Sequence, residues 1–146
     1  MKALIQRVSE ARVSIDGEIA GEIGSGLLVL LGLDRDDGRQ HLDRMVSKLL
    51  GYRIFADDDG KMNLSVTDTS GGVLVVSQFT LSADTGRGLR PSFTTALHPD
   101  KAEPLYAQFI DLLQDRHSPV AQGRFGADMQ VSSVNDGPVT FMLEVH

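Results

Sequence analysis

The sequence predicts a mixed α/β fold, in which mixed and curled β-sheets form a barrel-like core with two main helices packed against it. Patterns typical of strands, a helix, strands, a second helix and further strands follow one another along the chain, and this order indicates that helices and sheets share a core. The length of 146 residues and the 41% hydrophobic content suit one domain of ordinary size. No repeat or interdomain linker is visible, so we expect a single domain over residues 1–146.

The first part of the chain has the pattern of a β-hairpin followed by a buried strand. Apolar and polar residues alternate over residues 11–15, and Asp16-Gly17 then supplies a dipeptide typical of tight hairpin turns. The run GLLVLLG at residues 26–32 has no polar interruption and is too short for an independent helix. It is therefore predicted to be a strand that is covered on both faces.

Two segments have apolar residues spaced three and four positions apart, as on one face of a helix. The first covers residues 42–50 and the second covers residues 99–116. In the second segment, Asp100 is the candidate N-cap. These segments are the two main helices of the predicted fold.

Three further strands are predicted. Residues 73–79 (VLVVSQF) have a buried, β-branched character at first and become polar at the end, where a strand would emerge from the core. Residues 129–134 and 139–145 have the character of two closing strands, separated by NDGP at residues 135–138.

Composition excludes several classes of chemistry. The absence of cysteine excludes disulfides, thiolate metal sites and a cysteine nucleophile. The four histidines are scattered, with no pair at one-turn spacing, so no metal site is expected. A phosphate-binding glycine loop and a GxSxG nucleophile elbow are also missing, and no cofactor is expected.

Charge and hydropathy limit the partners. A net charge of -6 disfavours a surface that coats nucleic acid, so we expect no DNA partner and only a local contact with any RNA. Arg7 interrupts the N-terminal segment before a signal-peptide core could form, and the longest apolar stretch, residues 27–31, is far shorter than the about 20 residues of a membrane span. We therefore expect a cytoplasmic protein without a membrane partner.

Two polar segments remain as candidates for chemistry. At residues 77–81 (SQFTL) the predicted strand ends, and a strand end can expose backbone N–H groups that hold a developing oxyanion. The alternative is that Ser77 and Thr80 only satisfy neighbouring backbone groups. For residues 135–140 (NDGPVT), the alternative to a functional site is a simple turn.

These two segments occur together with MKALIQRV at the start of the chain, RPSF at residues 90–93 and FGADMQV at residues 125–131. Their order and spacing resemble the D-aminoacyl-tRNA deacylase family, also called D-tyrosyl-tRNA deacylase, essentially end to end. The resemblance implies hydrolysis of the ester between a D-amino acid and the terminal adenosine of tRNA, and by extension removal of mischarged glycine. It also implies a homodimer, in which a cis Gly137-Pro138 peptide reaches into the partner's pocket and excludes L-amino acids.

The resemblance further implies roles for single residues. Backbone N–H groups around Gln78 and Phe79 would hold the ester carbonyl oxygen, while Ser77 shapes the strand end. The role of Thr80 is left open, because it could be a nucleophile or only a structural residue. No His or Lys base can be assigned beside it from the sequence, so attack by water, assisted by the substrate's ribose hydroxyl, fits better. Arg7 would brace the Gly-Pro segment, the alternative being an exposed strand charge. The residues expected to contact the acceptor end of the tRNA are Arg90, Ala96, Phe125, Gly126 and Met129.

Two other classes of function remain as alternatives. Residues 82–92, with Arg87, Arg90, two glycines and Pro91, are predicted to form a mobile basic loop. A non-catalytic binder of RNA ends would keep this loop and the pocket without cleaving an ester. A metabolite-binding, β-rich oligomer would use the polar strand end only for structure. One departure from the family concerns residues 86–89, whose sequence GRGL is less basic than is usual in this loop and bears on phosphate affinity.

Overall fold

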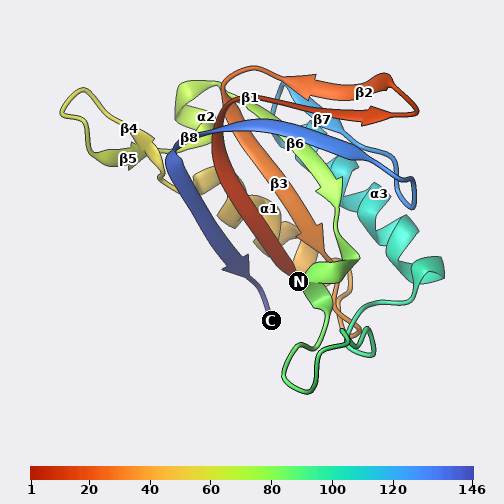
Figure 1. Ribbon diagram of the computed structural model, residues 1–146. Coiled ribbons are helices and arrows are strands. Elements are labelled where there is room, and N and C mark those ends of the chain that lie inside the picture. The colour runs from red at the N-terminus through yellow and green to blue at the C-terminus, as the bar shows by residue number, and fades with distance from the viewer.

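The computed structural model describes residues 1–146 and has a six-stranded sheet as its main element (Figure 1). The strand order is β2-β1-β3-β6-β7, with β8 also paired to β1, and β4 and β5 form a separate small sheet. The elements in chain order are β1 (Lys2–Ile15), β2 (Glu18–Ile23), β3 (Gly26–Gly32), α1 (Arg39–Gly51), β4 (Phe55–Ala56), β5 (Met62–Leu64), α2 (Val66–Thr69), β6 (Gly72–Ser77), the 3₁₀ helix η1 (Phe79–Ser82), α3 (Pro99–Arg116), β7 (Val120–Gln122) and β8 (Gln130–Glu144). The predicted mixed α/β class with two main helices, α1 and α3, is confirmed.

The main sheet curls until it nearly closes. The first half of β1 pairs with β3 and its second half pairs with β2, both antiparallel, while β3, β6 and β7 run parallel. The two ends of this path meet, because a Cβ atom on Gly21 of β2 would lie only 2.6 Å from the carbonyl oxygen of Gln122 on β7. Glycine at position 21 therefore permits the approach that makes the sheet barrel-like.

Both faces of the central strands are covered, as the run at residues 26–32 predicts. Leu27 and Val29 of β3 belong to the larger hydrophobic cluster, which also contains the buried side chains of α1 and α3. Leu28 points into a second cluster between the sheet's other strands. The two helices also contact each other, because Arg116 of α3 donates hydrogen bonds to Asp43 and Ser47 of α1.

The hairpin at Asp16-Gly17 is confirmed. Both residues have positive φ angles, 51° and 80°, as a two-residue turn of this kind requires. Two other local predictions are wrong. The strand predicted for residues 73–79 ends at Ser77, and η1 follows it. The N-cap of α3 is His98 and not Asp100, because Nδ1 of His98 accepts a hydrogen bond from the Asp100 N–H at 3.4 Å.

The two closing strands are one strand, which corrects the prediction of a break at residues 135–138. β8 pairs with β1 on both sides of these residues, and the register shifts near its middle. The pairs on either side of the shift are Gln6 with Thr140 and Val8 with Asn135. Several residues of β8 therefore bulge out opposite a single residue of β1, and Figure 1 shows β8 bending there, beside β4 and β5.

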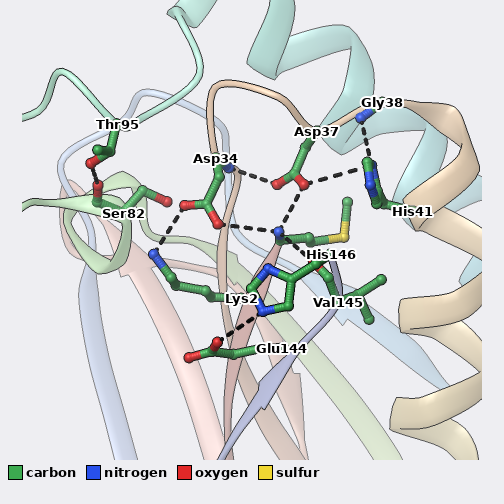
Figure 2. A network of polar contacts seen from close by, with 11 residues as sticks. Lys2, Asp34, Asp37, Gly38, His41, Ser82, Thr95, Glu144, Val145 and His146 are labelled. Atoms are coloured by element: carbon green, nitrogen blue, oxygen red, sulfur yellow. Dashed lines mark hydrogen bonds and ion pairs between the residues drawn. The ribbon is translucent and has the colours of Figure 1, made fainter.

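A network of charged groups fastens the start of β1 to the loop after β3 (Figure 2). The Met1 ammonium donates to the carboxylates of Asp34 and Asp37 at 3.2 and 2.7 Å, and Lys2 Nζ donates to Asp34 at 3.1 Å. Asp34 also forms an isolated β-bridge with Ala96. The network thus connects β1 to the loop that precedes α3. No helix in the molecule has both the length and the apolar character needed to cross a membrane.

The pKa of Asp34 is lowered by this network. Burial alone would raise the pKa of this carboxyl, but the Ser82 hydroxyl, Lys2 and the terminal ammonium together outweigh that cost. The pKa in the folded protein therefore lies below the value in the unfolded chain. Ionised Asp34 stabilises the fold above the unfolded pKa, and this stabilisation is lost as the pH falls through the folded pKa.

We expect Asp34→Asn to lower the urea midpoint at pH 7 and to lower it progressively less as the pH falls below the unfolded pKa of about 4 toward the lower folded pKa of Asp34. Urea unfolding followed by circular dichroism between pH 3 and pH 7 measures both curves. Asp58→Asn, at an exposed turn position with no hydrogen bond from its side chain, is the matched control and should shift neither curve. A constant difference between Asp34→Asn and wild type across this range would contradict the prediction.

Candidate functional site

A cavity of about 610 Å³ opens where the parallel strands β3 and β6 end. It is lined by 17 residues, of which 12 are hydrophobic, so it offers an apolar surface with a few polar groups, as binding sites for small molecules commonly do. The structure brings together these site residues predicted from sequence: Ser77, Gln78, Phe79, Ala96, Phe125, Gly126 and Met129. Thr80 follows Phe79 in sequence but is not part of the lining. The other predicted site residues outside the lining are Arg7, Arg90, Gly137 and Pro138.

The end of β6 places backbone groups at the cavity wall. The strand's hydrophobic residues are buried, but Ser77 and Gln78 are half-buried and the chain then turns into η1. The Gln78 N–H donates to the carbonyl oxygen of Leu31 at 2.8 Å, so it is not available to a ligand. The N–H groups of Phe79 and Thr80 have no acceptor within the chain, as is usual for the first residues of a helix. The backbone N–H groups left free at this strand end are therefore those of Phe79 and Thr80, whereas the expected pair was Gln78 and Phe79.

Aromatic side chains border the cavity. Phe79 is 58% exposed and Phe93 is 40% exposed, and their ring centroids lie 5.0 Å apart. Exposed rings of this kind provide faces on which a nucleic-acid base can stack. Phe93 belongs to the loop at residues 90–96 that the family resemblance associates with adenosine recognition, but its pairing with Phe79 joins residues distant in sequence and has no local signal.

The lining contains no Asp, Glu, Lys or Arg. Its one titratable side chain is His98, which sequence reasoning missed because a lone histidine before a proline carries no recognisable pattern. The hydroxyl of Thr80 accepts a hydrogen bond from Gln78 Nε2, and neither histidine nor lysine is bonded to it. The cavity therefore has no carboxylate that could act as a general base, and Thr80 has no adjacent group that would activate it as a nucleophile.

Arg90 belongs to the loop between η1 and α3. This loop is closed at its base by the bridge of Asp84 with Ser92, in which the Asp84 N–H donates to Ser92 O at 2.7 Å. The Arg90 side chain is exposed and makes no hydrogen bond or ion pair within the chain. It is therefore free to meet a ligand outside the cavity, but the structure does not bring it to the lining.

The bulge of β8 is held by side chains around it. Arg7 donates through Nε to Asp136 O at 2.9 Å and through Nη1 to Ile54 O at 2.8 Å. Asn135 Oδ1 accepts a hydrogen bond from the Val139 N–H at 2.8 Å, which closes the base of the bulge. Arg7 is thus a structural brace at this position and not an exposed strand charge.

Gly137 and Pro138 form the tip of the bulge and are exposed. The peptide bond between them is cis, and Gly137 has a φ of 142°. A Cβ atom on Gly137 would lie 2.6 Å from Val139 Cγ2 and 3.2 Å from Arg7 Nη2, so the brace leaves room only for glycine. The tip does not contribute to the cavity of its own chain.

Comparison with known proteins shows the family to which the chain belongs. The sequence model of a family described as D-Tyr-tRNA(Tyr) deacylase matches residues 4–144. The chain belongs to this family. It is 59% identical to the D-aminoacyl-tRNA deacylase of Escherichia coli O81 (strain ED1a), over 99% of this chain and 100% of the relative, and 58% identical to that of Shigella boydii serotype 18 at the same coverage. The chain is accordingly a D-aminoacyl-tRNA deacylase, a hydrolase.

Solved structures show the same fold in relatives of the deacylase. The structure named c-Myc DNA Unwinding Element Binding Protein is 42% identical, has a TM-score of 0.96 and is matched over 100% of this chain and 99% of its own. A structure titled as a probable eukaryotic D-amino acid tRNA deacylase has a TM-score of 0.81 at 19% identity, over 99% and 98% of the two chains. The second likeness concerns the fold alone.

Proposed function

We propose that the cavity at the end of β3 and β6 binds the terminal adenosine of D-aminoacyl-tRNA together with the ester that the deacylase cleaves. The observation that carries this proposal is the pair of free N–H groups, at Phe79 and Thr80, beside an apolar cavity. Donors fixed in this way stabilise the negative charge that develops on an ester carbonyl oxygen during attack. The exposed rings of Phe79 and Phe93 stack against the adenine base.

Water attacks the ester with help from the substrate's own ribose hydroxyl. The lining contains no carboxylate or lysine, and its one imidazole, His98, is exposed and accepts the Asp100 N–H through Nδ1 at the start of α3. This supports attack that does not depend on a protein base. An aminoacyl ester is already an activated acyl group, so positioning and oxyanion stabilisation supply the acceleration that the reaction needs. No covalent intermediate forms with the protein.

Thr80→Ala should retain at least about one third of the wild-type kcat, because the variant keeps the backbone N–H and loses only a hydroxyl that is bonded to Gln78. Single-turnover hydrolysis of D-aminoacyl-tRNA measures the rate. Mass spectrometry of the quenched protein is the companion measurement. A loss of about 1,000-fold, or an acyl group found on Thr80, would show that Thr80 is the nucleophile.

Chirality is read by Gly137 and Pro138 of a second subunit. D and L substrates carry the same groups and differ only in the direction in which the side chain leaves the α-carbon, so affinity for the side chain cannot separate them. A fixed backbone wall can do so by occupying the space that an L side chain needs. The exposed tip, its brace on Arg7 and its absence from the cavity of its own chain support this role.

The functional unit is a homodimer. β8 carries the tip and also exposes the apolar side chains of Val131, Val134 and Met142, which are 41%, 50% and 45% accessible. Apolar side chains along one exposed strand support burial against a second copy. The dimer places each tip at the cavity of the other subunit, and sedimentation equilibrium of the purified chain measures its mass.

Hydrolysis timed on matched D- and L-aminoacyl-tRNA tests the proposal. We expect cleavage of the D ester, at least about 100-fold slower cleavage of the L ester, and measurable cleavage of the glycyl ester, because glycine has no side chain to meet the wall. Equal rates for the two enantiomers would reject the wall. Binding of the acceptor end without turnover would favour the non-catalytic alternative.

The protein acts in the cytoplasm, where aminoacyl-tRNA is used, and on the acceptor end alone. A local contact of this kind is compatible with a net charge of -6, and the exposed Arg90 supplies positive charge for the adjoining phosphates. DNA binding, which the name of one structural relative states, is not expected of this chain, since an acidic chain has no broad surface for a duplex.

A further inference from the structure

Tyr106 of α3 is buried beside the cavity without lining it. Its side chain is only 4% exposed, and its hydroxyl donates to the carbonyl oxygen of Val75 at 3.2 Å. Its ring lies against Phe125, which does line the cavity, with the centroids 5.9 Å apart and the planes inclined by 46°. Burial raises the pKa of the Tyr106 hydroxyl, so this group is a neutral donor at any working pH.

The Val75 carbonyl oxygen connects two segments that contribute residues to the cavity, namely the end of β6 and the loop after β7. It accepts a second hydrogen bond, from the Gly123 N–H at 3.0 Å, and an acceptor with two lone pairs can satisfy both donors. Two residues beyond Val75 the chain reaches Ser77, and two residues beyond Gly123 it reaches Phe125. The Val75 carbonyl oxygen is therefore close in sequence, through Val75 itself and through its partner Gly123, to both Ser77 at the strand end and Phe125 in the lining.

We infer that Tyr106 is a positioning residue for the deacylase reaction: its hydroxyl fixes α3 against the strand that ends in the oxyanion donors, and its ring holds Phe125 in place at the cavity lining. The inference rests on the proposed function of the cavity. Through the position of the strand end, the hydroxyl determines how well the N–H donors align with the ester, and this alignment affects kcat. Through its contact with Phe125, the ring determines the shape of the surface that binds the substrate, and this surface affects KM.

Tyr106→Phe removes the hydroxyl with little damage elsewhere. The ring and its contact with Phe125 remain, and Val75 O keeps the Gly123 N–H, so no buried acceptor is left without a donor. We expect kcat for D-aminoacyl-tRNA to fall about 5- to 50-fold, since small misplacements of reacting groups have effects of this size, with KM within about twofold of wild type. Tyr106→Leu also loses the ring and should raise KM in addition.

Tyr52→Phe is the matched control. Tyr52 forms a second tyrosine–phenylalanine pair, with Phe141 at 5.6 Å, but its hydroxyl makes no hydrogen bond within the chain and neither ring lines the cavity. This variant should keep the wild-type kcat and KM. Rates are measured per folded molecule, well below the thermal midpoint of each variant.

Tyr106→Phe with wild-type kcat, or with a change in KM alone, would overturn the inference. A loss of kcat that disappears when rates are corrected for unfolded protein would also overturn it. Phe125→Ala separates these results from a failure of the proposed site: unchanged kinetics in Phe125→Ala would mean that the ester is cleaved elsewhere. If Phe125→Ala is impaired and Tyr106→Phe is not, the cavity stands and only the role of Tyr106 falls.

Discussion

Phe79→Pro is expected to lower kcat for D-aminoacyl-tRNA about 100- to 1,000-fold below that of Phe79→Ala. Both variants lose the aromatic ring, but only proline removes the backbone N–H, so their ratio isolates one oxyanion donor. Losses of this size are typical when a single such donor is removed. Single-turnover hydrolysis with saturating enzyme measures the ratio without interference from weaker binding.

The proline is compatible with the local backbone. Position 79 is the first residue of η1, where proline is favoured, and its N–H has no acceptor within the chain that would be lost. Circular dichroism and the thermal midpoint should therefore be similar for the two variants. Equal kcat values in two equally stable proteins would show that the Phe79 N–H does not contact the developing charge.

Gly137→Ala is expected to abolish discrimination between D and L esters and to lower activity on the D ester at least about tenfold. The φ of 142° strains any residue with a Cβ atom, at a cost of about 1 to 3 kcal/mol, and the new atom would lie 2.6 Å from Val139 Cγ2. The tip must move to relieve both, and the wall moves with it. Paired assays with D- and L-aminoacyl-tRNA and sedimentation of the dimer measure the effects.

Gly60→Ala is the control for backbone strain alone. Gly60 also has a positive φ, 76°, but a Cβ atom there would meet nothing within 4 Å. It should lose a similar amount of stability and keep both activity and selectivity. If Gly137→Ala retains the selectivity of the wild type, the tip has no part in reading chirality.

The fold class, a tight turn and the two main helices were predictable from sequence, whereas the pairing of distant strands was not. Asp16-Gly17 determines a tight turn through its own backbone preferences, and the helix over residues 99–116 follows from its apolar spacing. The bulge at residues 135–138 looked like a turn between two strands because the same residue types favour both. The structure shows one strand because residues on both sides of the bulge pair with the same strand, β1, which is distant in sequence.

The site shows the same division. Membership of Ser77, Ala96 and Phe125 in one cavity followed from the family resemblance and agrees with the structure. The occupied N–H of Gln78 could not be predicted, because it depends on the parallel register that places Leu31 beside the end of β6. The contribution of Tyr106 is hidden for a similar reason: in sequence it is one more apolar position on a helix.

The free N–H groups of η1 also affect how the protein tolerates mutation. A main-chain donor survives almost every replacement of the side chain attached to it, so a saturation scan should find position 80 more permissive than its place in the reaction would suggest, whereas position 79 also carries the stacking ring. Random substitution would then seldom reveal the atoms that act on the ester. Evolution can vary the outer surface of such a site while its chemistry stays constant.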